Sequence, residues 1–225
     1  MKISWKDILV DVVFTNRKSI ALFVDSSSNV KIRCPFKTKK AFLIEFLDKH
    51  QSWVEKRLQR VKKIKKRTFS NGSIFLFLGK EYPLEIKLCE KNSVKLQAGK
   101  LKVCCQDLCN IKVYIQCWYR LQANRFFPQQ TRRVAKKMGA NFASIKITSA
   151  KKRWGSCSSR GNICINWKLI QAPISIINYV LIHELVHTIF HNHSKAFWEK
   201  VKQVCPKVEE RKRWLKDNGN LLTDI

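Results

Sequence analysis

Four of the five histidines in this 225-residue chain lie between positions 183 and 193. His183 and His187 are four residues apart, so on a helix they stand one turn apart on the same face and can bind one metal ion. Glu184 lies next to that face, where its carboxylate can take a proton from a metal-bound water molecule. This H-E-x-x-H spacing is typical of zinc-dependent hydrolases. We therefore expect a zinc site in which Glu184 activates water.

The third zinc ligand has to come from His191, His193 or a carboxylate such as Glu199. On a straight helix His191 would lie about 12 Å from His183, which is too far for two imidazoles that each bind a metal at roughly 2 Å. His193 can bind only if the chain turns near Asn192. The sequence favours that turn, because Asn tolerates a left-handed conformation and the serine after His193 can cap a following helix. His193 is the expected ligand, with Glu199 as the alternative.

Three neutral histidines leave one coordination position of zinc open, and zinc bound in this way lowers the pKa of its water towards about 7. Glu184 would accept the proton and later deliver it to the leaving group. Zinc and a nearby cation would stabilise either the oxyanion of a peptide carbonyl or the charge of a phosphoryl group. The pattern predicts a metal-dependent hydrolase and leaves open which bond it cuts.

The helix that carries the histidines must be positioned by its neighbours in the C-terminal half. Three helices are expected there, at residues 174–190, 194–204 and 208–217. Before them, the segments 144–154 and 162–169 read as two strands around a Ser-Ser-Arg-Gly turn, which predicts a hairpin beside the site. A longer amphipathic helix is expected over residues 107–138, with a kink near Pro128.

The first 105 residues are dominated by short strand patterns. Strands are expected at residues 8–14, 20–24, 30–34, 74–78, 82–88, 94–96 and 101–105. An amphipathic helix over residues 38–66 interrupts them. The fold class is therefore α+β, with an antiparallel, β-rich N-terminal region over residues 1–105 and a zincin-like, largely helical hydrolase domain over residues 106–225.

The chain is strongly basic, with 45 Lys and Arg against 16 Asp and Glu and a formal net charge of +29. Such a field attracts nucleic acids, nucleotides or acidic membranes, although it does not choose among them. The basic end of the expected helix, at residues 56–67, is a candidate nucleic-acid contact. A nucleic-acid-binding protein with a non-catalytic zinc is thus an alternative function, but structural zinc sites are normally closed by four ligands, often Cys.

Nine cysteines make an odd number, and Met1 is followed by a polar stretch in place of an apolar signal-peptide run. A reducing, cytoplasmic environment is therefore expected. Cys104, Cys105 and Cys109 lack the paired C-x-x-C spacing of a zinc knuckle, so we interpret them as structural thiols. No segment reaches the roughly 20 apolar residues that a membrane span needs.

Several motifs together resemble one known family. They are Leu78–Tyr82, Trp118–Arg120, Arg153–Ser158, Asn166-Trp167, His183–His187, Asn192–Ser194, Phe197-Trp198 and Arg213–Leu215. The chain resembles the YgjP-like metallopeptidase family, relatives of the SprT and WLM zincins, over nearly its whole length. The resemblance implies that His183, His187 and His193 bind one Zn²⁺ per chain and that Glu184 is the catalytic acid and base. Val186 stands where relatives often have Ala, which is a conservative change.

The resemblance leaves two substrate classes open, because some members of that family are described as UTP pyrophosphatases. The substrate is expected to be a protein or peptide, or an anionic molecule such as a nucleoside triphosphate. Arg153 and Asn166 are the candidates for substrate contact, since they lie in or beside the motifs around the hairpin. Trp154 and Trp167 are expected to pack in the core.

Overall fold

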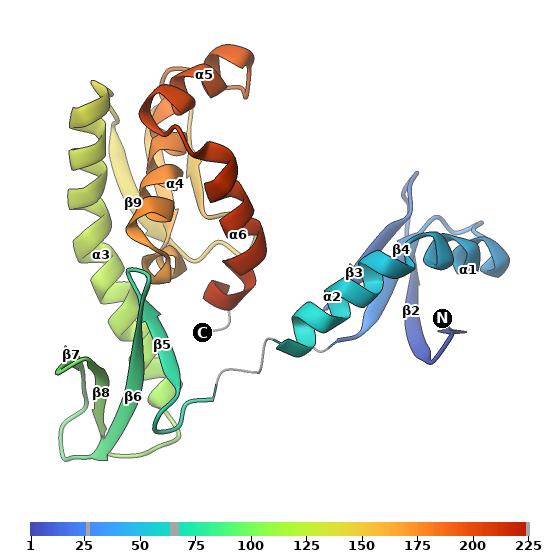
Figure 1. The fold of residues 1–225 in the computed structure, drawn as a ribbon, viewed down its shortest axis with the longest axis horizontal. Coiled ribbons are helices and arrows are strands. Elements are labelled where there is room, and N and C mark those ends of the chain that lie inside the picture. The colour runs from blue at the N-terminus through green and yellow to red at the C-terminus, as the bar shows by residue number, and fades with distance from the viewer. Residues whose placement is uncertain (26–27, 64–67, 224–225) are drawn as a thin grey trace. The chain divides into compact units, whose positions relative to one another are not determined.

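In the computed structural model, which describes residues 1–25, 28–63 and 68–223, the chain divides into two compact units, Met1–Lys66 and Arg67–Ile225. The described residues form three mixed sheets together with helices, as Figure 1 shows. This confirms the expected α+β class. Among the described residues, no helix has the length and apolar character that a membrane crossing requires.

The N-terminal unit contains a four-stranded sheet in the order β1-β2-β4-β3. Its strands are β1 (Lys2–Trp5), β2 (Ile8–Phe14), β3 (Ala21–Val24) and β4 (Val30–Cys34). The central pair β2 and β4 is parallel, while the outer pairs are antiparallel. The expectation of an antiparallel region is therefore wrong for this pair, because β3 forms a hairpin with β4 and takes the edge position. Strand β1, in a stretch that looked merely polar, was not expected.

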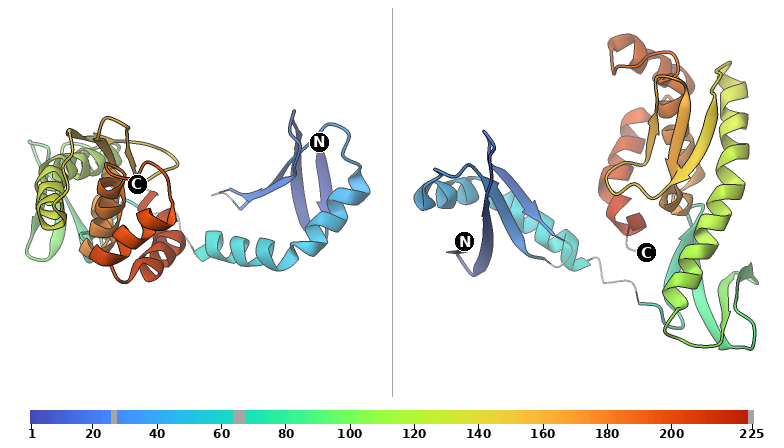
Figure 2. Two further views of the ribbon diagram at one scale, coloured as in Figure 1. Left: turned by 90° about the horizontal axis from the view of Figure 1, so that it is seen from above. Right: turned by 180° about the vertical axis from the view of Figure 1, so that it is seen from behind.

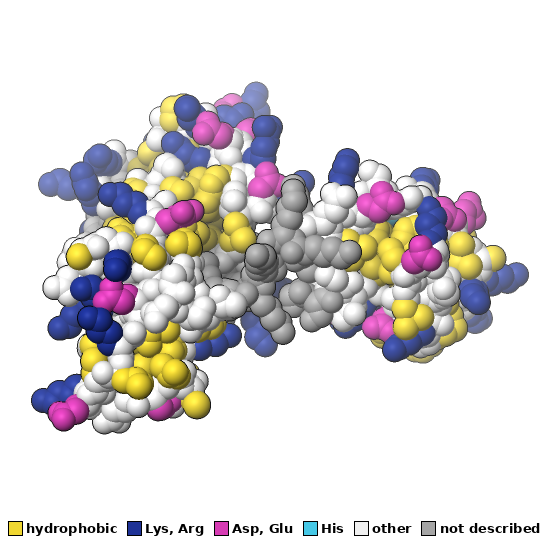
Figure 3. Space-filling model, turned by 60° about the horizontal axis from the view of Figure 1, so that its bottom comes forward, with side chains coloured by type: hydrophobic (Ala, Val, Ile, Leu, Met, Phe, Trp, Pro, Cys, Tyr) yellow, Lys and Arg dark blue, Asp and Glu magenta, His cyan; other side chains and the backbone are white. Residues whose placement is uncertain are grey.

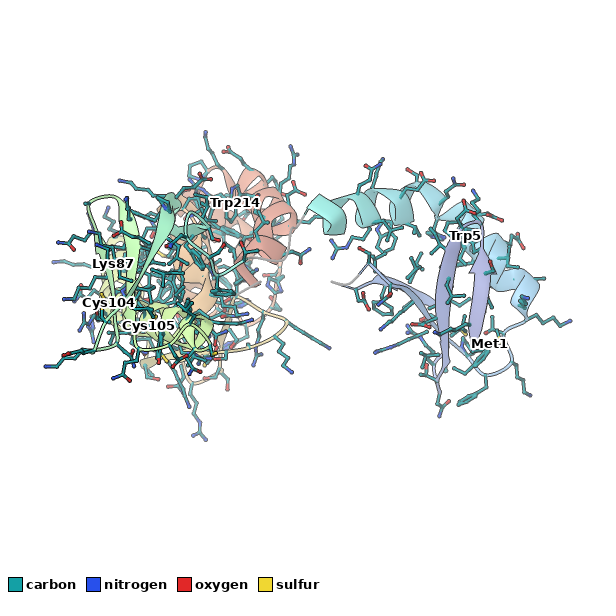
Figure 4. All side chains as sticks on the ribbon, turned by 90° about the horizontal axis from the view of Figure 1, so that it is seen from below. Met1, Trp5, Lys87, Cys104, Cys105 and Trp214 are labelled. Carbon is teal, nitrogen blue, oxygen red and sulfur yellow. The ribbon has the colours of Figure 1, made fainter. Side chains whose placement is uncertain are left out.

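Two helices cover this sheet where one was expected over residues 38–66. They are α1 (Lys40–Lys49) and α2 (Gln51–Lys63). The break lies at His50, which leaves the helical conformation (φ −106°, ψ 14°) and whose ring Nδ1 lies 2.8 Å from the carbonyl oxygen of Phe46. Trp5 lies between its strand and the helices (Figure 4), and its indole N–H donates to Asp48 at 2.7 Å. Residues 64–66 of the expected helix, and part of its basic end, lie outside the described residues.

The C-terminal unit begins with a sheet that repeats this strand order as β5-β6-β8-β7. Its strands are β5 (Ile74–Phe77), β6 (Lys80–Leu88), β7 (Ser93–Gln97) and β8 (Lys100–Cys105). The central strands β6 and β8 are again parallel. Lys87 of β6 lies opposite Cys104 of β8 (Figure 4). Phe75 and Leu101 of this sheet belong to the same core as the helices that follow. The first compact unit ends at Lys66, whereas the sequence analysis placed the domain boundary after residue 105.

The tip of the β5–β6 hairpin packs against residues 170–173. Leu78 and Gly79 both have positive φ, 51° and 80°, as a tight two-residue hairpin turn requires. Their N–H groups donate to the carbonyl oxygens of Ile170 and Gln171 at 2.9 and 3.1 Å. A Cβ atom on Gly79 would lie 2.6 Å from the Cα of Pro173, so glycine is needed for this contact.

Helix α3 (Ile111–Met138) is 28 residues long, contains Pro128 and ends at Gly139, which adopts the left-handed conformation with φ 63°. It begins four residues later than expected, because the Asp107 carboxylate accepts N–H bonds from Cys109 and Asn110 at 2.8 and 3.2 Å in the preceding turn. The helix runs along one side of the second sheet of the unit (Figure 2).

That second sheet has the order β10-β11-β9, from β9 (Ser144–Thr148), β10 (Gly155–Cys157) and β11 (Asn162–Asn166). The hairpin is formed by β10 and β11, while β9 pairs with β11 in parallel. The expected strand over 144–154 is therefore interrupted after Thr148. In the loop that interrupts it, the carbonyl oxygens of Ala150 and Arg153 accept hydrogen bonds from the side-chain amide of Asn166 at 2.8 and 3.3 Å. The 3₁₀ helix η1 (Trp167–Gln171) follows directly.

Three helices complete the unit: α4 (Ile174–Val186), α5 (Lys195–Val204) and α6 (Val208–Thr223). Helix α4 packs against α3, α5, α6 and β10, and most of its side chains are buried on all sides. It ends at Val186, four residues earlier than expected. On the face drawn in Figure 3, Lys and Arg side chains project from the edges of both units with Asp and Glu side chains between them, so the positive charge there is spread over the surface.

Candidate metal centre

Three imidazoles converge where α4 ends. One ring nitrogen of each of His183, His187 and His193 lies within 4.8 Å of the corresponding nitrogens of the other two. The Nε2 atoms of His183 and His193 are 3.1 Å apart. Two ligands that bind zinc tetrahedrally at about 2.0–2.1 Å lie about 3.3–3.4 Å from each other. The cluster therefore has the size that a nitrogen-bound metal ion requires.

The chain reverses between the second and third histidine. His187 is the C-cap of α4, and the N–H of Phe190 donates to the carbonyl oxygen of Val186 at 2.9 Å in the turn that follows. Ser194 caps α5, accepting the N–H of Phe197 at 3.4 Å. This places His193 at the corner, as the spacing predicts. Asn192 is not among the residues with positive φ, so the expected left-handed turn there is wrong.

Aromatic rings from α5 form one wall of the histidine cluster. The ring of Phe197 lies 4.6 to 5.0 Å, between centroids, from all three imidazoles and is fully buried. Trp198 stacks on His193 at 5.7 Å with an interplanar angle of 23°. These rings exclude water from one side of the imidazoles and restrict their orientation.

Burial favours the uncharged form of His183 and His187. Desolvation, followed by the charges of the neighbouring histidines and of Lys212, lowers the pKa of His183 to about 4. Burial also lowers the pKa of His187, whose Nδ1 lies 3.0 Å from the carbonyl oxygen of Phe190. That bond fixes the tautomer in which Nε2 is free to bind a metal. The buried Nδ1 of His183 has no hydrogen-bond partner among the described residues.

Glu184 lies beside the cluster with only 6% of its surface exposed. Burial raises the pKa of its carboxyl group to about 7, while the charge of Arg153 acts in the opposite direction. The carboxylate is packed against the backbone of β10: a Cβ atom on Gly155 would lie 2.5 Å from its Oε1. A base with a pKa near 7 in a dry position is suited to moving protons at neutral pH.

The other candidate residues lie outside the cluster of three histidines. His191 is exposed and lies outside the three-imidazole cluster. The side chain of Glu199 is 60% exposed and lies 3.9 Å from Lys195. Arg153 is exposed, whereas Asn166 is 3% exposed. Trp167 is buried in the core, as expected, and Trp154 is partly buried against it.

The sequence did not indicate Tyr179 or Lys212 as neighbours of the site, nor the contact that Gly155 makes with Glu184. Gly155 makes room for Glu184. The Trp-Gly-Ser motif that contains it is the sequence feature from which this contact could have been suspected. Tyr179 lies one turn before His183, with ring centroids 6.2 Å apart. The ammonium of Lys212 lies 3.6 Å from the centroid of Trp198, and no sequence pattern indicates that α6 returns to the site.

Comparison with known proteins adds the following. No curated protein matches the chain. Two crystal structures of metallopeptidase zymogens are similar to part of it: Pyrococcus abyssi abylysin is 23% identical with a TM-score of 0.37, over 40% of this chain and 91% of its own. Methanocaldococcus jannaschii jannalysin is 21% identical with a TM-score of 0.35, over 40% of this chain and 92% of its own. A family model described as the YgjP-like metallopeptidase domain matches residues 18–218. The chain therefore belongs to the YgjP-like metallopeptidase domain family, whose members are metal-dependent hydrolases.

Proposed function

We propose that this protein is a zinc-dependent peptidase whose metal is held by His183, His187 and His193. The observation that carries the proposal is the convergence of three imidazoles beside a buried carboxylate in a metallopeptidase-family domain. Nitrogen ligands of this kind suit zinc, which commonly takes three protein ligands and leaves one position for substrate chemistry.

When bound, zinc would act as a Lewis acid that lowers the pKa of a water molecule and polarises the carbonyl group of the scissile peptide bond. Glu184 accepts the proton of the attacking water at its carboxylate and donates it to the leaving nitrogen. In the metal-free protein burial raises the pKa of Glu184 to about 7, which brings the carboxyl group closer to neutral pH than an ordinary glutamate. Phe197 and Trp198 cover one side of the histidine cluster.

The test separates metal binding from chemistry with two variants. Glu184→Gln preserves shape and removes the base, so it is expected to bind zinc like the parent and to lose peptide hydrolysis by at least about 100-fold. His193→Ala removes a ligand, so it is expected to lose zinc as well as activity. Zinc content by atomic absorption and cleavage of a mixed unstructured peptide library are the measurements. Parent-like hydrolysis by purified Glu184→Gln protein would exclude the mechanism.

A second candidate reaction is hydrolysis of a nucleotide phosphoanhydride, such as that of UTP. The observation that favours it is the run of cations Lys151, Lys152 and Arg153 next to Gly155, because phosphoryl transfer needs positive charge around the oxygens. The same metal-loaded protein is therefore assayed for pyrophosphate or phosphate release from nucleoside triphosphates. Release that depends on Glu184, with no peptide cleavage, would favour this reaction over the first.

A further inference from the structure

A small pocket lies between helix α6 and the loop that precedes Gly155 of β10. Its volume is about 200 Å³, and its walls include Lys151, Lys152 and Arg153 from the loop and Lys216 from the helix. This volume is below the roughly 300–1,000 Å³ of pockets that enclose drug-sized ligands. The pocket is therefore large enough for one side chain or terminal group.

Among the described residues, the charged side chains that line the pocket are all positive. Four of these lining residues are Lys or Arg and none is Asp or Glu. None of these four cations forms an ion pair among the described residues of the chain. Four cations around one small hollow repel each other, and an anionic group placed among them would relieve that repulsion.

Buried neighbours hold the pocket in shape. Asn166 lies at its inner wall and bonds to the carbonyl oxygens of Ala150 and Arg153, while its own N–H donates to the carbonyl oxygen of Trp154 at 2.8 Å. On the opposite wall Gly219 is buried against Trp154, where a Cβ atom would lie 3.3 Å from the indole ring. The cations of the loop are thus carried by a backbone that is fixed from beneath.

The pocket adjoins the reacting groups. Trp154, which lines it, is followed in the chain by Gly155, and Gly155 packs directly on the carboxylate of Glu184. Arg153 is close enough for its charge to act on that carboxylate. A substrate group bound in the pocket is therefore held near the scissile bond, at the end of β10.

We propose that this pocket, lined by Lys151, Lys152, Arg153 and Lys216, binds a carboxylate of the peptide substrate and gives the enzyme a preference for an acidic residue near the scissile bond. The inference rests on the proposed peptidase function. A carboxylate side chain matches both the volume of the pocket and its charge, whereas a nucleoside triphosphate is larger than the pocket.

The experiment measures binding in the Glu184→Gln background, so that no peptide is consumed. Fluorescein-labelled peptides carry a single Glu that is moved one position at a time, and each has a matched peptide with Gln at that place. At one position the Glu peptide is expected to bind about fivefold more tightly than the Gln peptide. The difference is expected to persist in the presence of a chelator, because the cations and not the metal produce it.

Charge variants then assign the preference to the pocket. Lys152→Gln together with Lys216→Gln is expected to reduce the preference to less than about twofold. Lys136→Gln with Lys137→Gln removes the same charge from exposed positions at the end of α3 and is expected to leave it unchanged. Circular dichroism checks that each variant is folded, and Lys152→Gln alone replaces the double variant if that one is not.

The possible failures are distinguishable. The pocket proposal is overturned if Glu and Gln peptides bind equally at every position. It is also overturned if the control variant loses the preference for Glu as much as the pocket variant does. Binding of a nucleoside triphosphate that depends on Lys152 and Lys216, without binding of any Glu peptide, also overturns it. If the Glu preference is found but the parent enzyme cleaves no peptide, the peptidase proposal fails while the carboxylate pocket stands.

Discussion

The carboxyl group of Glu184 is held in a nearly dry position and forms no ion pair with the described residues, and this lowers the stability of the metal-free protein when the group is ionised. Its pKa is raised to about 7 because the charged form loses its hydration. A group whose pKa is higher in the folded state stabilises the fold when it is protonated. That stabilisation is lost as the pH rises from the unfolded value, 4.5, through about 7.

Metal-free parent protein is therefore expected to lose stability relative to Glu184→Gln between pH 4.5 and 7, by up to about 3 kcal/mol. The lowered pKa of His183 acts in the opposite direction, adding stability as the pH rises from about 4 to 6.5. Because His183 is present in both proteins, its effect cancels in the difference. Urea unfolding of both proteins in a chelating buffer across this pH range is the measurement. A difference that does not change with pH would contradict the burial of the carboxylate.

Gly155→Ala tests the contact that positions Glu184. The new Cβ would lie within 2.8 Å of three atoms of the glutamate side chain, so that side chain must move. Hydrolysis is expected to fall about 100-fold, with zinc binding retained, because displacement of a catalytic group by about 1 Å has effects of that size. Ser156→Ala in the same strand is the control and is expected to keep activity within a few-fold. Unchanged activity in Gly155→Ala would show that the base needs no such support.

The convergence of the three histidines could be predicted from the sequence, whereas the residues around them could not, for a physical reason. The spacing of His183 and His187 is local information, and so is the serine cap that places His193. In contrast, Gly155, Tyr179 and Lys212 reach the site only through the packing of β10 and α6 around α4. Their positions depend on contacts between distant segments, which a spacing pattern does not contain.

At the level of elements, the strands were predicted well and their pairing was not. The alternation of apolar residues gives the bounds of β2 and β4 correctly, because a strand with one buried face has an apolar residue at every second position. It does not contain the direction of the neighbouring strand. In both four-stranded sheets the two central strands are parallel, each carrying an antiparallel partner at the edge. The short loops between strands led us to expect antiparallel hairpins throughout. The parallel pairing of β2 with β4 and of β6 with β8 was not expected.

The docked β5–β6 turn allows a matched test. Gly79→Ala introduces a side chain at φ 80° and 2.6 Å from Pro173, and is expected to destabilise the protein by about 3 kcal/mol. Gly99→Ala, in the β7–β8 turn, has φ 70° and open space around it. Gly99→Ala is expected to lower the free energy of unfolding by about 1 kcal/mol, because conformational strain is its only cost. Denaturant unfolding of both variants measures the difference, and equal losses would show that the contact with Pro173 contributes nothing.

At the scale of the whole molecule, every residue assigned to the site lies in the unit Arg67–Ile225, which has its own hydrophobic core. A fragment of residues 68–225 is therefore expected to fold, to bind one zinc ion and to retain the Glu184-dependent activity. Circular dichroism, metal analysis and the peptide assay check this. A fragment that is soluble and folded but binds no zinc would show that the unit Met1–Lys66 contributes to the site.

The three candidate ligands differ in how firmly the fold holds them. His183 belongs to a helix covered on nearly every side, whose amide protons should exchange with solvent only when the whole unit opens. His193 stands on an exposed corner between two helices. Opening of that corner alone would release one of the three nitrogens while α4 stays intact. Capture and release of the ion should therefore proceed through fluctuations of residues 187–193, at a rate set by this turn and not by global unfolding.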